Sequence, residues 1–187
     1  MVVKLNNPTD EQIVRNVISG NQSAYREIVE RYQQPLFRYV NYLIHDADTS
    51  EDVVQDTFIK AYKNLRGFHQ DAKFSSWLYR IAHNSAMDSL KHQSVSIDDL
   101  PVGEVPTSQE INAQDLVDQH IAAKDVTACL AKLPVKYCEV IALYYLKDAS
   151  YSEISDILHI SVSAVGARMN RAKSKLQTIC KARGVPQ

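Results

Sequence analysis

The sequence predicts an all-α protein made of two small helical domains joined by an acidic, flexible linker. Apolar residues recur at helical spacing in two blocks, residues 9–93 and 123–184, and neither block shows the alternation of a strand. The 5 Gly and 6 Pro are too few for a turn-dense all-β fold. With 45% hydrophobic and 23% charged residues, the chain has a globular composition. We expect the domains to cover residues 1–93 and 123–187.

The first block predicts four helices, each with a recognisable start. Thr9, which two acids follow, is expected to cap the first helix, because its hydroxyl accepts hydrogen bonds from free amides and acids favour the positive helix end. Ser23 is expected to cap the second helix. The acidic run at residues 49–52 is typical of the start of the third, and Ser75 or Ser76 of the start of the fourth.

Residues 94–122 differ from both blocks. They hold three helix breakers, Pro101, Gly103 and Pro106, among acids and Ser, with few large apolar side chains. Such a stretch gains little from burial, which predicts a linker. Its last part, residues 111–121, is expected to form a helical arm.

The second block predicts three helices. Pro134 fits the first turn of one helix, where its missing amide costs nothing. Ser150 and Glu153 form the S-x-x-E pattern of a capping box at the start of the next. Ser161 or Ser163 is expected to cap the last helix, whose inward row keeps helical spacing: Val162, Val165, Met169, Ala172 and Leu176.

The net charge of -1 hides a strong separation of charge along the chain. Residues 46–59 hold five acids and no Lys or Arg, whereas residues 60–93 hold six bases and two acids. Residues 94–123 hold six acids and no base, and residues 161–187 hold six bases and no acid. Solvated helix faces explain any one run, but the whole pattern favours two surfaces that face a polyanion.

The short helix at residues 150–158 and the longer one at residues 163–178 have the lengths and turn of a helix-turn-helix. The second helix then fits the major groove, with small residues near its start and Asn and Arg to read base edges. An ordinary helical hairpin with a basic surface is the alternative. The residues on its outward or flanking faces are Ser163, Ala164, Ala167, Arg168, Asn170 and Arg171, with Lys173 and Lys175 suited to phosphates.

Aromatic side chains lie among bases in residues 68–91, namely Phe68, Phe74, Trp77 and Tyr79. Unpaired bases stack on such rings while cations hold the backbone, which favours single-strand binding. The alternative is that Phe74, Trp77 and Leu78 belong to the core, and for Trp77 we favour it. Residues 66–71 are expected to form a turn that exposes some of the others.

Other classes of function have no pattern to support them. The chain has an odd number of cysteines without C-x-x-C spacing, namely Cys129, Cys138 and Cys180. We therefore expect neither a disulfide scaffold nor a zinc site, and we expect the protein to be in a reducing cytoplasm. Cys129 and Cys138 flank Pro134, which leaves open a redox role for them as near neighbours. The six His are scattered, and no P-loop or G-x-S-x-G is present. We therefore expect no metal, no membrane span, no signal peptide and no catalysis.

Two strings resemble region 2 of the extracytoplasmic-function (ECF, group IV) sigma factors of the sigma-70 family. They are E-D-x-x-Q-x-x-F within residues 50–58 and F-x-x-W-L-x-R-I-A-x-N at residues 74–84. Residues 133–154, with Val165 and Arg171-Ala172, resemble region 4. The likeness covers about residues 9–93 and 124–178, in family order.

The resemblance implies three binding surfaces. Region 2 docks on the β′ clamp helices of core RNA polymerase through Asp52, Gln55 and Asp56. The following loop and helix open and read the promoter −10 element, at Phe68, Lys73, Phe74, Trp77, Arg80, Asn84, Asp88 and Lys91. Region 4 docks on the β flap and reads the −35 duplex, at Ser163, Ala164, Ala167, Arg168, Arg171, Lys173 and Lys175.

The resemblance also implies an anti-sigma factor as partner, a linker that passes near the RNA-exit path, and neither cofactor nor small-molecule substrate. The chain departs from the family at the start of the recognition helix, where G-T-V-K-S-R is common. Ala164 and Gly166 replace the Thr and Lys, and Gly weakens a helix by about 1 kcal/mol. The Arg-rich run that many members carry after the position of Lys91 is also missing.

Two other functions remain open on sequence alone. A stand-alone helix-turn-helix regulator with a helical sensor half would bind duplex DNA tightly without polymerase, as a dimer. A helical adaptor whose basic faces meet acidic proteins would show no sequence-dependent DNA binding. The block around Asp52, Gln55 and Asp56, followed by Trp77 and Asn84, favours an alternative sigma factor over both.

Overall fold

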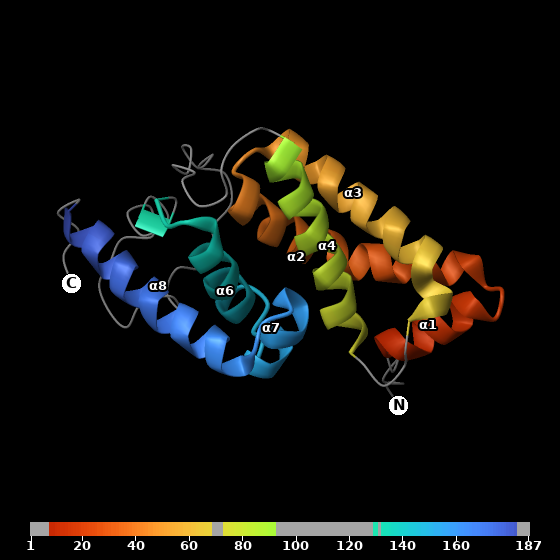
Figure 1. The fold of residues 1–187 in the computed structure, drawn as a ribbon. Coiled ribbons are helices and arrows are strands. Elements are labelled where there is room, and N and C mark those ends of the chain that lie inside the picture. The colour runs from red at the N-terminus through yellow and green to blue at the C-terminus, as the bar shows by residue number, and fades with distance from the viewer. Residues whose placement is uncertain (1–7, 69–72, 93–128, 131, 183–187) are drawn as a thin grey trace, which may run out of the picture.

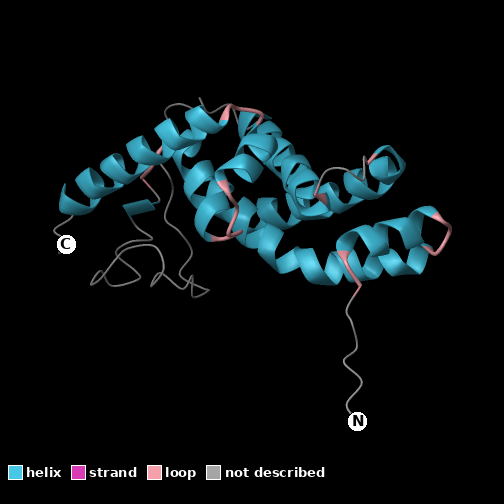
Figure 2. Ribbon diagram, turned by 90° about the horizontal axis from the view of Figure 1, so that it is seen from below, coloured by secondary structure: helices cyan, strands magenta, loops and turns pink. Residues whose placement is uncertain are grey.

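The structure, a computed structural model, describes residues 8–68, 73–92, 129–130 and 132–182. Every regular element within these residues is a helix, as Figures 1 and 2 show, which confirms the all-α class. The predicted linker at residues 94–122, with its helical arm, lies outside the described residues. The elements are α1 (Asp10–Ile18), η1 (Gln22–Ala24), α2 (Tyr25–Ile44), α3 (Ala47–Asn64), η2 (Leu65–Gly67), α4 (Phe74–His92), α6 (Val135–Tyr145), α7 (Tyr151–Leu158) and α8 (Val162–Ala182).

The first half is a bundle in which α2, α3 and α4 pack against one another and α1 packs on α2. The predicted cap of α1 is confirmed, since Thr9 and Gln12 form a reciprocal capping box. Helix α3 begins before the acidic run at residues 49–52 that was predicted to start it. Asp46 caps the helix by accepting a hydrogen bond from the Thr49 amide at 2.8 Å. Ser23 does not cap α2 but lies in the 3-10 turn before it.

In the second half, α6 packs on α8 and α7 lies against both. Pro134 occupies the N-cap of α6 rather than its first turn. The capping box of α7 is confirmed, because the Ser150 side chain and the Glu153 side chain each accept a hydrogen bond from the other's backbone amide. Of the two candidate caps of α8, Ser161 is the one whose hydroxyl accepts a hydrogen bond from the Ala164 amide, at 3.2 Å.

The two halves are packed together. One cluster of buried apolar side chains runs through both, α6 contacts α2, and α7 contacts α4 (Figure 1). Helix α6 is buried almost all round, from Val135 to Leu143 with Lys136 as the exposed exception. A helix that is apolar on every side belongs inside a protein. Here α7 and α8 cover one side of α6, and the first half covers the other.

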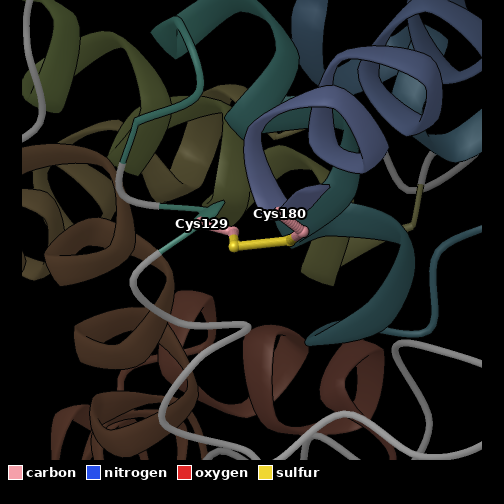
Figure 3. Close-up of a disulfide and its surroundings, with 2 residues drawn as sticks. All are labelled: Cys129 and Cys180. Atoms are coloured by element: carbon pink, nitrogen blue, oxygen red, sulfur yellow. A yellow bond between two sulfur atoms is a disulfide. The ribbon is translucent and has the colours of Figure 1, made fainter. Parts of the chain in front are cut away.

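The cysteines correct an expectation from the sequence. Cys129 and Cys180 form a disulfide, shown in Figure 3, with their Cα atoms 5.4 Å apart. It joins the chain just before α6 to the C-terminal end of α8. Cys138 is a separate buried thiol that donates to the Leu133 carbonyl, and burial raises its pKa to about 12. Spacing along a sequence did not reveal the pair, because its partners are 51 residues apart.

Candidate nucleic-acid interface

The outer face of α3 carries the predicted polymerase-docking residues. Asp52 and Gln55 are exposed, while Asp56 is half-buried and pairs with Lys60, whose Nζ lies 2.7 Å from its carboxylate. Lys60 also donates to the Ser85 hydroxyl of α4 at 2.9 Å. The structure therefore brings the three residues onto one helix face, with Asp52 and Gln55 the more accessible.

The same face continues into an apolar surface that the sequence motifs did not indicate. Ile59 and Tyr62 are 52% and 39% exposed, unusually high for large apolar side chains in this molecule. With Tyr25, Val29 and Phe58 they line an open pocket of about 760 Å³ between α2 and α3. Exposed apolar surface next to charged residues is typical of protein–protein contacts.

The aromatic side chains before and within α4 form one cluster. The ring centroids of Phe68, Phe74 and Trp77 lie 5.3 to 5.6 Å apart. Phe74 and Leu78 are buried, as the core alternative predicted, whereas Trp77, for which we favoured the core, is only half-buried. Phe68 and Tyr79 are buried as well, so the turn before α4 does not expose Phe68. Phe68 and Phe74 would have to leave the core to stack on a base, so in this state Trp77 is the most accessible of the rings.

The polar residues predicted to bind the −10 element divide into two groups. Asn84, Asp88 and Lys91 are exposed near the C-terminal end of α4, with Lys91 and Asp88 3.6 Å apart. Lys73 instead forms an ion pair with Glu153 of α7 at 3.0 Å, and Arg80 has a buried Nε without a hydrogen-bond partner. Lys73 thus contacts the other half of the chain, while Arg80 is half-buried.

The outward face of α8 is accessible. Ser163, Ala167, Arg171 and Lys173 are exposed, and Ala164 is half-buried beside the Ser161 cap. The exposed Lys175 has its ammonium 5.7 Å from the centroid of the Tyr137 ring. These residues share the solvent side of a helix whose other side, at Val165, Met169 and Ala172, is buried. That arrangement fits a recognition helix anchored by its apolar row.

Arg168 differs from the other predicted −35 residues. Its guanidinium donates to the carboxylate of Glu139 on α6, which is buried with 6% of its surface exposed. Burial raises the pKa of Glu139 to about 7, and Arg168 acts in the opposite direction by favouring the charged carboxylate. The structure thus places Arg168 in an internal ion pair that fastens α8 to α6.

Four residues that the sequence analysis did not single out connect the two halves. His83 of α4 lies 3.8 Å from the Glu139 carboxylate and 3.1 Å from the Tyr39 hydroxyl. Burial, together with the nearby charge of Arg168, lowers the pKa of His83 to about 4. Lys147 lies over the Tyr79 ring at 5.2 Å. One feature of the sequence could have indicated this contact: Glu139 is a carboxylate in a helix that is otherwise apolar on nearly every side, and a buried carboxylate needs a partner.

The described residues contain neither a cluster of metal-ligating side chains nor a helix that could span a membrane. No three His, Cys, Asp or Glu side chains in the structured part of the chain come together as a metal site. Among the helices that the structure describes, none has both the length and the apolar composition needed to cross a membrane.

Both halves match parts of one family of proteins. Residues 28–95 match sigma-70 region 2 and residues 123–176 match sigma-70 region 4, which defines the class of the chain as a transcription initiation factor of the sigma-70 type. SigW, an ECF RNA polymerase sigma factor of Bacillus subtilis, is 29% identical over 173 residues, covering 88% of this chain and 92% of SigW. The ECF sigma-E factor of Escherichia coli K12 is 33% identical over 177 residues, covering 90% and 92%.

Solved structures agree with this assignment. CnrH, in complex with the cytosolic domain of CnrY, has a TM-score of 0.69 at 28% identity and covers 92% of this chain and 97% of its own. The sigma factor RpoE of Bartonella quintana, in complex with NepR, shares the fold with a TM-score of 0.64 at 20% identity, over 84% and 96% of the two chains. The chain belongs to the ECF RNA polymerase sigma factors. It is an alternative sigma factor, and a stand-alone regulator is not favoured.

Proposed function

We propose that this sigma factor docks on core RNA polymerase through α3, captures the −10 element as a single strand on α4, and reads the −35 duplex with α8. One observation supports this division of labour most directly. The exposed acidic and apolar face of α3 and the exposed basic face of α8 belong to separate halves of one chain, each of which matches a sigma region. The β′ clamp helices and the β flap are the proposed polymerase contacts.

The domain boundaries follow the same division. The proposed region 2 covers residues 1–93, the acidic linker residues 94–122, and region 4 residues 123–187. The family matches end at residue 95 and resume at residue 123, which supports these limits. The linker has the charge of nucleic acid, which suits a path near the RNA exit.

The docking surface on α3 combines charge and apolar area. Asp52 and Gln55 provide exposed polar contacts, and Ile59 and Tyr62 add apolar surface along the same side. Burying apolar surface contributes about 25 cal/mol per Å², so this part of α3 supplies affinity while the acids orient the partner. Asp56 contributes less because Lys60 already neutralises it.

On α4, we assign base stacking to Trp77 and backbone contacts to Arg80 and Lys91, with Asn84 and Asp88 facing base edges. Phe68 and Phe74 support Trp77 from below. On α8, Ser163, Ala167 and Arg171 face the groove, and Lys173 and Lys175 lie toward phosphates. Each surface alone binds weakly, and docking on polymerase raises the effective concentration for the second contact.

Further features follow from this function. The relatives CnrH and RpoE are found with CnrY and with the anti-sigma factor NepR, so we propose an anti-sigma partner for this chain as well. The protein acts in the cytoplasm, where core polymerase is found. It needs no cofactor and no small-molecule substrate, and it catalyses no reaction of its own.

Run-off transcription with purified core polymerase on a promoter library tests the proposal. The complex is expected to initiate from a defined subset of promoters that share two spaced elements. Arg171→Ala should weaken initiation at those promoters, whereas Glu27→Arg, an exposed charge change on α2, should not. Transcripts identical to those of core enzyme alone would refute the function.

A further inference from the structure

The exposed side chains along the outer face of α3 are ordered by charge. Most of them are three, four or seven residues apart, so they form one row along the helix that continues into η2. We call this the α3 row, and its exposed members are Asp48, Asp52, Ile59, Tyr62, Lys63 and Arg66. The row thus runs from acidic side chains, through apolar ones, to basic ones.

The apolar centre of the row is a fixed surface. Ile59 and Tyr62 are exposed, yet the Tyr62 ring packs edge-on against the Tyr25 ring of α2, with centroids 5.0 Å apart. The Tyr25 hydroxyl in turn donates to the Phe58 carbonyl at 2.8 Å. The open pocket between α2 and α3 lies beside these rings and provides a recess. Side chains that are already held in place lose little freedom when a partner covers them.

The charged ends of the row are available for a partner. Among the residues that the structure describes, none forms an ion pair with Asp48, Asp52, Lys63 or Arg66. The neighbouring pair of Asp56 and Lys60 differs, because these two side chains already neutralise each other at 2.7 Å. The row therefore offers acids at one end and bases at the other to whatever covers its apolar centre.

The order of charges makes the row complementary to itself. In a two-fold dimer, residue i of one copy meets residue j of the other, and j meets i. When two copies of α3 cross antiparallel near residue 57, Asp52 of each copy comes opposite Lys63 of the other, and Asp48 comes opposite Arg66. The apolar centres then meet in the middle. A parallel arrangement would instead set like charges together, which disfavours it.

We propose that two copies of this chain associate through the α3 row as an antiparallel, two-fold pair. The interface is small and its ion pairs are exposed to solvent, so the association is weak and depends on concentration. The pair covers Asp52 and the apolar centre of α3, which are also the proposed docking surface for core polymerase. A second copy and core polymerase therefore compete, and this consequence alone rests on the proposed function.

Charge exchange tests the pairing. Sedimentation velocity of the full chain, from about 5 to 500 µM, should show wild type shifting from monomer to dimer. Asp52→Lys and Lys63→Glu each set like charges opposite one another, and each should weaken the dimer by about tenfold or more. An equimolar mixture of the two variants should associate like wild type, because every contact in the mixed pair joins opposite charges.

The double variant, Asp52→Lys with Lys63→Glu, tests the antiparallel direction. It exchanges the two charges, so an antiparallel pair recovers, whereas a parallel pair would keep like charges together. Glu27→Lys on α2 and Lys132→Glu before α6 repeat the single charge changes at exposed positions outside the row and should associate like wild type. Circular dichroism establishes that every variant keeps its helices.

Ile59→Ser tests the apolar centre without changing charge. Because Ile59 is exposed, the variant should fold like wild type and weaken the dimer by about tenfold, since both copies lose apolar contact. Competition is tested by adding core polymerase to the dimeric sample. The polymerase complex should contain one copy of the chain, and two copies on one polymerase would refute a shared surface.

The outcomes decide the proposal. A wild-type chain that stays monomeric up to the highest concentration would refute it. A dimer that ignores the charge variants, or a variant mixture that stays monomeric, would refute pairing through the α3 row. Association that behaves as expected alongside failed run-off transcription would refute the sigma function and keep the pairing. Successful transcription with a monomer at all concentrations would do the reverse.

Discussion

At the scale of single residues, Arg168 lies on the proposed recognition helix but its guanidinium is paired with Glu139 of α6. Its pair with Glu139 predicts that Arg168→Ala lowers the free energy of unfolding by about 2–4 kcal/mol, because it leaves a buried carboxylate without its partner. The raised pKa of Glu139, about 7, allows that group to take up a proton and limits the loss. Urea unfolding at mildly alkaline pH measures the effect.

Arg171→Ala provides the comparison on the same helix. Arg171 is exposed, so its removal should leave unfolding unchanged and weaken duplex binding, by about 1–3 kcal/mol if it reads a base. Equal stability of the two variants would show that the Arg168–Glu139 pair contributes nothing.

His83 predicts a pH dependence whose direction follows from its pKa. Burial holds the pKa of His83 at about 4 in the packed chain, below the ordinary 6.5, so the unfolded or opened chain binds more protons between these values. Stability therefore falls as the pH drops from about 6.5 toward 4, by at most about 3 kcal/mol. The comparison of wild type with His83→Gln isolates this share.

That comparison is needed because other charged groups face His83. Arg168 and His159 also act to lower the His83 pKa. Glu139 contributes in the opposite direction, since its raised pKa means that its share of stability is present at low pH and lost as the pH rises through about 7. Unfolding midpoints of wild type and His83→Gln that stay parallel across the acidic range would rule out the His83 contribution.

At the scale of elements, Gly166 is a weak point inside α8. A Cβ at this position would meet only the Tyr151 ring, at an ordinary 3.8 Å, and the backbone there is helical. Gly166→Ala should therefore stabilise the chain by about 1 kcal/mol, a rise in melting temperature of about 2–4 °C. Gly20→Ala is the matched control and should destabilise, because Gly20 has a φ of +114°. A thermal melt in which both variants shift alike would contradict the helical account.

The disulfide predicts a redox-dependent stability of the second half. Cys129 and Cys180 close a loop with a sequence separation of 51, for which chain entropy gives at most about 4 kcal/mol. Reductant should lower the unfolding midpoint of wild type but not of Cys129→Ser. Cys138→Ser should keep the full response, since Cys138 lies outside the pair. A response to reductant in Cys129→Ser would mean that another group carries it.

The elements also show where sequence reasoning succeeds. Thr9 and the Ser150–Glu153 box were predictable because a cap is decided within four residues of chain. The start of α3 was misplaced because both Asp46 and the acidic run after it suit a helix N-terminus, and only the backbone shows which residue caps. Local chemistry thus predicts that a helix exists better than where it begins.

The contacts that sequence reasoning missed are all non-local. Glu139 meets Arg168 across 29 residues and His83 across 56, and the disulfide joins residues 51 apart. No pattern within one helix contains such pairs. Phe68 and Phe74 are a similar case. Their aromatic rings are of the kind that stacks on bases, but both are buried because of how α2 and α4 pack, which a local pattern does not show.

At the scale of the whole molecule, the position of α3 decides whether the proposed docking surface is accessible. It packs on α2 and α4 and lies on the side of the first half away from α8 in Figure 1. Asp52 and Gln55 are therefore exposed while the two halves are packed together. We therefore expect core polymerase to reach the proposed docking surface on α3 without any separation of the two halves.

This accessibility predicts the behaviour of an α3 variant. Asp52→Arg should weaken binding to purified core polymerase by about tenfold or more, a loss of about 1.4 kcal/mol, and leave thermal unfolding unchanged, because Asp52 is exposed. Glu27→Arg makes the same charge change at an exposed position on α2 and should bind like wild type. Equal losses in both variants would mean that binding to core polymerase depends on overall charge rather than on the α3 face. The next candidate for docking would then be α6, whose apolar surface becomes accessible only when the two halves separate.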